Sequence, residues 1–371
     1  MENPFLITGY ISPAYFCDRE EETDRIISAL QNRRNMTITS MRRMGKTGLI
    51  KNVFYQLKDA ETRLLYVDII ASGSLSEFVK MLCNAMLLEE KKRSKGYLKR
   101  ISRLLSGMKA HLVFDHITGV PSVEIGYTHP HETEMNLEQL FTYLSQQNAR
   151  YVIAIDEFQQ INEYPEKNME AILRTYVQQL NNVSFLFSGS NQHLLTSMFS
   201  NYGRPFYQSA DFLFLNRIPK EVYAVFIHDQ FTKHNRQIER EQVENILDFY
   251  DLYTFYVQAY FNRLFATGEK KIHQALIEKI KTTLLEEREY IFQNYKNLLT
   301  ANQFDLLKAI SKEESVRQPT SKAFMQKYGF VQASALSKTL KALMDKEFVY
   351  RENECYKLPD IFFAKWLQLK Y

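Results

Sequence analysis

The feature that most constrains this 371-residue sequence is a short run, Met36–Ser40, that leads directly into the segment SMRRMGKT at residues 40–47. This segment follows the phosphate-binding pattern GxxxxGK[ST], with Ser40 in the position of the first glycine. Such a loop binds phosphates because its backbone N–H groups and the positive end of the following helix point at the anion. A strand before the motif and a helix after it are the context that this chemistry requires, so the sequence predicts a nucleotide site. The candidate cofactor-binding residues in the loop are Arg42, Arg43, Met44, Gly45, Lys46, Thr47 and Gly48.

The second feature is the apolar run Tyr151–Ile155, which ends in the carboxylates Asp156 and Glu157. An aspartate at the end of such a strand is typical of a Walker B motif, where it holds Mg²⁺ and its water shell. A glutamate beside it is able to orient and deprotonate an attacking water. An acidic turn after a core strand is common in isolation, but here it occurs together with the GKT loop. We therefore expect Thr47 and Asp156 to bind the metal, and Glu157 and Lys46 to be catalytic.

Two further catalytic candidates lie downstream. The run Val183–Ser188 is followed by Gly189 and Ser190, and in a parallel sheet these small polar residues lie beside Asp156. Ser188 is then a candidate to contact the terminal phosphate, although small residues after a strand are also common turn formers. Arg204 is a candidate sensor of the same phosphate, and a surface arginine is the alternative interpretation.

The periodicity of the sequence changes twice along the chain. Up to about residue 215, short β-branched or aromatic runs alternate with amphipathic stretches, which predicts a parallel α/β sheet flanked by helices. Residues 219–299 show only helical spacing of apolar residues, which predicts an all-α lid. The last seventy residues predict three helices and a strand-turn-strand segment, the order of a winged helix-turn-helix. We therefore expect three domains, at residues 1–215, 216–299 and 300–371.

Composition narrows the class of protein. Hydrophobic residues make up 45% and charged residues 24% of the chain, which is ordinary for a globular protein. No run approaches the length of a membrane span, and the three scattered cysteines suit neither a disulfide framework nor a metal site. We expect a cytoplasmic protein without membrane contact. The net charge of +4 is small, but residues 91–103 hold a local basic excess that is typical of a solvated helix face.

Together these residues resemble the archaeal-type ATPase family, P-loop ATPases related to the STAND and AAA+ ATPases. The resemblance rests on Phe16–Glu22, Met41–Thr47, Ile155–Gln159, Phe187–Ser190 and Tyr202–Arg204. It implies a P-loop sheet, a helical lid and a winged helix, with binding of ATP and Mg²⁺ and with ATP hydrolysis. It also implies a position for Arg19 near the adenine and a γ-phosphate role for Arg204. The chain departs from the family at Ser40, at Met41, and at Thr254, where the lid motif G-G-x-P-Y has proline.

Two functions remain open at this point. The first is an ATP-dependent switch or motor, in which nucleotide state is coupled to the C-terminal domain and to a protein partner or self-association. The second is a DNA-binding regulator with a secondary nucleotide site. In that case residues 300–371 bind DNA, with Ser334, Ser337, Lys338 and Lys341 toward the major groove and Arg351 and Lys357 near the backbone.

Overall fold

The computed structural model describes residues 2–58, 61–93, 95–126 and 130–371. The chain divides into two compact units, which we call the sheet unit (residues 9–216) and the helical unit (residues 1–8 with 217–371). The finer division of the helical unit at residue 300 stays a prediction. Among the described helices, none combines the length and the apolar character that a membrane span needs.

The sheet unit is built on five parallel strands in the order β2-β5-β6-β1-β7. The strands are β1 (Met36–Thr39), β2 (Thr62–Asp68), β5 (Arg150–Asp156), β6 (Val183–Gly189) and β7 (Asp211–Phe214). The three central strands are buried along almost their whole length, as expected for a parallel sheet with helices on both faces. The prediction of a parallel α/β sheet is confirmed. Because the strands are parallel, their carboxyl ends lie along one edge of the sheet.

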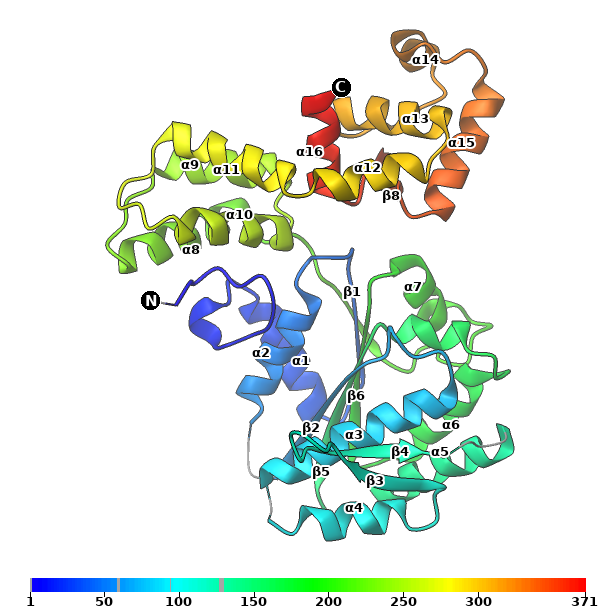
Figure 1. The fold of residues 1–371 in the computed structure, drawn as a ribbon. Coiled ribbons are helices and arrows are strands. Elements are labelled where there is room, and N and C mark those ends of the chain that lie inside the picture. Colours follow the sequence, from blue (N-terminus) through cyan, green and yellow to red (C-terminus); the bar gives the residue numbers. More distant parts are fainter. Residues whose placement is uncertain (1, 59–60, 94, 127–129) are drawn as a thin grey trace. The chain divides into compact units, whose positions relative to one another are not determined.

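Helices cover both faces of this sheet, and alternate residues of a strand enter different cores (Figure 1). In β5, Val152 and Ala154 pack with α1 and α2, whereas Ile153 and Ile155 pack with the helices of the other face. The helices of the sheet unit are α1 (Glu20–Gln31), α2 (Lys46–Gln56), α3 (Leu75–Arg93), α4 (Tyr97–Leu105), α5 (Pro130–Ser145), α6 (Met169–Gln179) and α7 (Gln192–Ser200), with the short 3-10 helices η1 (Pro13–Tyr15) and η2 (Phe158–Glu163).

An antiparallel hairpin of β3 (Ala110–Phe114) and β4 (Pro121–Ile125) is inserted between α4 and α5. The pattern of Gly119, Pro121 and Gly126 around a β-branched run predicts a hairpin within residues 119–126. The first strand of the hairpin begins earlier, at Ala110. Asn84 of α3 fixes the hairpin, because its amide accepts from the Val123 N–H at 2.8 Å and donates to the Val123 carbonyl at 3.3 Å.

The first part of the helical unit is all-α, as predicted for the lid. It consists of α8 (Lys220–Lys233), α9 (Arg240–Phe249), α10 (Thr254–Ala266), α11 (Gln274–Glu286) and α12 (Glu289–Asn297). Its core is rich in fully buried tyrosines, among them Tyr250 and Tyr256. In the turn before α10, Asp251 and Leu252 have φ angles of 48° and 56°. This left-handed backbone favours glycine, and it is where the resembled family motif has its two glycines, so the turn keeps that backbone shape without them.

The second part of the helical unit is the winged helix, which confirms the predicted fold class. Its elements are α13 (Ala301–Lys312), α14 (Lys322–Tyr328), α15 (Ala333–Asp345), the wing strands β8 (Tyr350–Glu352) and β9 (Cys355–Lys357), and α16 (Ile361–Lys370). Ser321 caps α14 at its start and Gly329, with φ 73°, ends it. The sequence pattern did not indicate α16.

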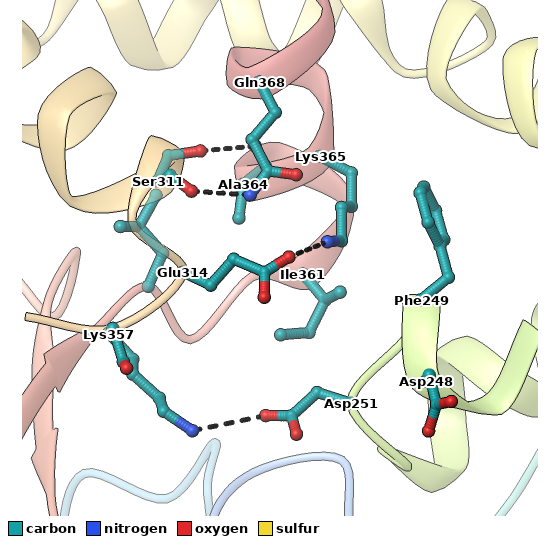
Figure 2. Close-up of a pocket in the computed structure, with 12 residues that line it drawn as sticks. Asp248, Phe249, Asp251, Ser311, Glu314, Lys357, Ile361, Ala364, Lys365 and Gln368 are labelled. Atoms are coloured by element: carbon teal, nitrogen blue, oxygen red, sulfur yellow. Dashed lines mark hydrogen bonds and ion pairs between the residues drawn. The ribbon is translucent and has the colours of Figure 1, made fainter. Parts of the chain in front are cut away.

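Lid and wing meet at a polar junction that Figure 2 shows around a small cavity of about 170 Å³. Asp251 of the lid accepts from Lys357 of the wing at 3.5 Å, and the Arg217 guanidinium lies between Asp251 and Glu352 at 2.9 Å from each. On the wall formed by α13 and α16, Lys365 pairs with Glu314 at 2.9 Å (Figure 2). The contacts of Asp251 and Arg217 with Lys357 and Glu352 therefore link the two parts of the helical unit, whereas the Lys365–Glu314 pair lies within the winged helix.

Candidate functional site

The GKT loop joins β1 to α2 at the carboxyl edge of the sheet. Its two left-handed residues are Arg43 (φ 69°) and Gly45 (φ 94°), so the loop does not need left-handed backbone at Ser40. The serine hydroxyl instead contacts Lys46, whose ammonium donates to Ser40 Oγ at 3.2 Å and to the carbonyls of Ser40 and Met41 at 3.3 Å. Burial lowers the pKa of Lys46, while the nearby charges of Glu157 and Asp156 act in the opposite direction.

Asp156 lies at the centre of the site and is 3% exposed. Its Oδ2 accepts from the Thr47 hydroxyl at 2.8 Å and from the Tyr66 hydroxyl at 2.9 Å. Its Oδ1 accepts from the Ser188 hydroxyl at 2.5 Å. The structure therefore brings together Thr47, Asp156 and Ser188, which were predicted from three separate motifs. Hard oxygen ligands of this kind suit Mg²⁺, which is usually held by one or two carboxylates together with phosphate oxygens.

Among the described residues, the hydrogen-bond partners of the Glu157 side chain all contact one of its two oxygens. Its Oε2 accepts from the Ser190 N–H at 3.0 Å, the Ser190 hydroxyl at 2.8 Å and the Gln159 amide at 2.6 Å. The backbone of Glu157 is left-handed, with φ 56°, which is a strained conformation of the kind that clusters at active sites. Oε2 is thus fully engaged, and Oε1 is the oxygen left to accept a proton.

Gly189 is required by the position of Gln159. A Cβ at residue 189 would lie 2.0 Å from Gln159 Oε1, and no side chain fits there while the amide stays in place. Gln159 is 9% exposed, and its Oε1 has no hydrogen-bond partner among the described residues. Ser190 was expected beside Asp156 as part of the small polar segment after β6, but its contact with Glu157 was not predicted. Functional roles for Gln159 and Tyr66 were not predicted either. For Gln159, the available signal in the sequence was its position two residues after Glu157.

The other predicted nucleotide ligands have different surroundings. Arg42 is exposed and its Nε lies 3.4 Å from Ser190 Oγ, whereas Met44 is buried. Gly48 faces Phe16, whose ring is 3.3 Å from where a Cβ would be. Arg19 is 4% exposed and donates to Glu22 at 2.8 Å and to the Asn216 carbonyl at 2.5 Å, so its guanidinium serves internal contacts in this structure.

Arg204 forms an ion pair with Glu170 of α6 and donates to Asn162 at 2.9 Å. Burial raises the pKa of Glu170, and the Arg204 charge opposes that rise. The structure therefore shows Arg204 engaged with a carboxylate, and its role as a phosphate sensor stays a prediction.

Comparisons with known proteins agree with this fold. Residues 29–198 match a family model described as "AAA domain", and residues 290–369 match one described as "Probable winged helix domain". No curated protein sequence matches the chain.

Three solved structures share the fold over almost the whole chain. A Walker-type ATPase of Pyrococcus abyssi is 15% identical, with 98% of this chain and 99% of that chain covered and a TM-score of 0.64. The ORC2 protein of Aeropyrum pernix, in ADPNP–ADP complexes, is 15% identical, with 99% and 98% covered and a TM-score of 0.57. The ORC1 protein of Aeropyrum pernix, in complex with DNA, is 11% identical, with 96% and 93% covered and a TM-score of 0.52.

The fold and the site define an AAA-type P-loop ATPase domain. This domain precedes a helical lid and a C-terminal winged helix domain. The resemblance inferred from the sequence is thereby confirmed as an AAA domain followed by a C-terminal winged helix domain.

Proposed function

We propose that the chain binds ATP with Mg²⁺ and hydrolyses it, as a nucleotide-dependent switch or motor whose output is the winged helix. The observation that supports this best is the meeting of Thr47, Asp156 and Ser188 beside Lys46 and Glu157. Thr47 and Asp156 would hold the metal, which supplies charge neutralisation to the phosphates. Lys46 would bind the β- and γ-phosphates, and Glu157 would accept a proton from water through Oε1. A sensing role for Arg204 requires its exchange from Glu170 to phosphate.

The test is steady-state hydrolysis and equilibrium binding of ATP with Mg²⁺ for the wild type, Lys46→Ala and Glu157→Gln. We expect Lys46→Ala to lose both binding and turnover, because a buried cation that faces the phosphates is removed. Glu157→Gln should keep binding and lose turnover by at least about 100-fold. Normal turnover in Glu157→Gln would exclude Glu157 as the base, and a wild type that binds no nucleotide would exclude the proposal as a whole.

A second candidate function is DNA binding through the winged helix. It is supported by α15, on which Ser334, Ser337, Lys338 and Lys341 are all exposed on the face opposite to the buried leucines. Lys357, by contrast, is paired with Asp251 and Glu352, and Arg351 stacks on Tyr356. If α15 enters the major groove, Lys338→Ala with Lys341→Ala should weaken duplex binding and reduce its salt dependence. If the double variant bound the duplex with the same affinity and the same salt dependence as the wild type, DNA binding through α15 would be excluded.

A further inference from the structure

The end of α3 and all of α4 carry a dense basic segment that the nucleotide site does not use. Residues 91–103 contain seven lysines and arginines and no acidic residue. The segment belongs to the sheet unit, between β2 and the inserted hairpin. Ser94 within it lies outside the described residues.

The acids that precede this segment neutralise only part of it. Glu89 and Glu90 are each 6% exposed. Arg93 donates to Glu89 at 2.7 Å, and Arg100 donates to Glu90 at 2.6 Å. Lys92 approaches Glu89 only at 3.5 Å. Buried carboxylates therefore anchor the two arginines, and the remaining cations point outward.

We call the remaining cations the basic ridge: Lys91, Lys92, Lys95, Lys99 and Arg103. All five are exposed. Within the part of the chain that the structure describes, Lys91, Lys95, Lys99 and Arg103 have no acidic residue at ion-pair distance. Such a concentration of uncompensated charge raises the local potential and attracts a polyanion.

The apolar side of α4 is not available to a partner. Ile101, Leu104 and Leu105 are buried in the core that also covers one face of the sheet. Leu98, at 37% exposure, is the largest apolar side chain that α4 shows to solvent. A membrane-surface helix inserts an apolar face into the lipid, and α4 has already committed its apolar face to the core. Protein interfaces are depleted of lysine and centred on apolar or aromatic residues. The hollow beside the ridge is instead lined by four cations and one half-buried aromatic residue, Tyr97.

We propose that the basic ridge binds the phosphate backbone of double-stranded nucleic acid, independently of base sequence. Interfaces with nucleic acid are polar and strongly positive, and about half or more of their hydrogen bonds go to phosphate and sugar oxygens, with lysine and arginine among the main donors. Lys99 and Arg103 are four residues apart on α4, which corresponds to about 6 Å along a helix axis, and Lys95 lies in the turn just before that helix. Alternate phosphates of one strand are about 7 Å apart along the duplex axis. An open hollow of about 470 Å³ beside Lys91, Lys92 and Lys95 gives a phosphate room to approach.

The test compares two triple variants of the full chain that remove the same charge. The ridge variant is Lys91→Ala, Lys95→Ala and Lys99→Ala. The control is Lys270→Ala, Lys271→Ala and Lys279→Ala, three exposed lysines of the lid. Binding to a labelled duplex of about 30 base pairs is followed by fluorescence anisotropy between about 50 and 200 mM salt. Thermal unfolding verifies that both variants are folded.

We expect the ridge variant to lose affinity by at least about tenfold and its salt slope to fall by about three, since three phosphate contacts are removed. The control should bind as the wild type does. An equal loss in both variants would mean that net charge alone is responsible, and would overturn the proposal. So would loss of binding only in Lys338→Ala with Lys341→Ala, because the duplex would then lie on α15. Tighter binding of polyglutamate than of duplex would assign the ridge to an acidic protein instead.

Discussion

Thr47 and Asp156 are 109 positions apart in the sequence, and their side chains share a hydrogen bond of 2.8 Å. The strands that precede them, β1 and β5, are not neighbours, because β6 lies between them. The contact therefore depends on the order of the sheet and on the carboxyl edge at which all three strands end. It also joins the two motifs that the sequence indicates most clearly.

Replacement of this hydroxyl tests its proposed role as a metal ligand. Thr47→Val keeps the side-chain shape and removes the oxygen, so Mg²⁺-dependent turnover should fall by about 10- to 100-fold. Thr47→Ser keeps the oxygen and is the matched control. Hydrolysis is measured against Mg²⁺ concentration, and an unchanged metal dependence in Thr47→Val would contradict the assignment.

Ser190 should act on turnover only through Glu157. Ser190→Ala removes one of the three hydrogen bonds to Glu157 Oε2, and the loosened carboxylate should lower kcat by about tenfold with little change in KM. The double variant with Glu157→Gln should be no slower than Glu157→Gln alone, because residues that act as a unit are not additive. Additive losses in the double variant would show that Ser190 contacts the substrate directly.

Gly189→Ala should also act on turnover through Glu157, and it should change the stability of the protein little. The new methyl would meet the flexible end of Gln159, which is able to move away and would then release Glu157. Turnover should therefore fall, while the free energy of unfolding changes by less than about 1 kcal/mol. Gly73→Ala, whose Cβ would be 3.7 Å from Glu77 Oε2, is the control and should change neither. Wild-type kinetics in Gly189→Ala would contradict the constraint on Gln159.

The Arg204–Glu170 pair predicts a pH-dependent stability. Burial raises the pKa of Glu170 above its unfolded value, so its stabilising contribution is complete below the unfolded pKa and is lost as the pH rises through the folded pKa. Arg204→Ala removes the cation that limits this loss, and should destabilise the sheet unit by about 1–3 kcal/mol at pH 7. The difference from wild type should shrink toward pH 4, where Glu170 is protonated.

Urea unfolding at the two pH values measures this effect. Glu170→Gln with Arg204→Ala should recover part of the stability at pH 7, because no buried charge is then left unpaired. A difference between Arg204→Ala and wild type that stays constant with pH would show that the ion pair is not its cause.

The wing turn offers a test of backbone strain. Asn353 and Glu354 join β8 to β9 with φ angles of 47° and 66°, the pattern of a two-residue turn that prefers glycine at its second position. Glu354→Gly and Glu354→Ala both remove the exposed ion pair with Arg317, and only glycine relieves the left-handed backbone. Glu354→Gly should be more stable than Glu354→Ala by about 1 kcal/mol in thermal unfolding. Equal stability would mean that the turn stores no strain.

Much of the fold was predictable because its signals are local. The strand ending at Asp156 and the helix between Ser321 and Gly329 follow from apolar runs and from capping residues that act on their immediate neighbours. In contrast, α16 is apolar on several sides, with Phe362, Phe363 and Trp366 all buried, and so shows no helical period. The strand β7 is only four residues long and, unlike β1 of the same length, it leads into no motif that marks its end.

The residues of the candidate site that belong to motifs were predictable from the sequence, but the contacts between their side chains were not. Lys46 and Asp156 belong to patterns in which one residue type has one chemical task, so they are found without a structure. The hydroxyl of Tyr66 reaches Asp156 because β2 pairs with β5 in one particular register, with Tyr66 opposite Ala154. No spacing in the sequence encodes that register. The roles of Ser190 and Gln159 likewise depend on where β6 ends relative to Glu157.

The order of the sheet has a consequence for the newly made chain. Lys46 and Thr47 leave the ribosome early, but Asp156 follows only after the hairpin insertion, and Ser190 later still. Because the loop after β1 has no carboxylate partner until β5 and β6 have paired, a nascent chain that stops before Ser190 lacks the complete pocket. A nascent chain is therefore able to bind nucleotide in the complete pocket only after its central strands have paired in the native register. The ligand then stabilises only the chains in which these strands have paired.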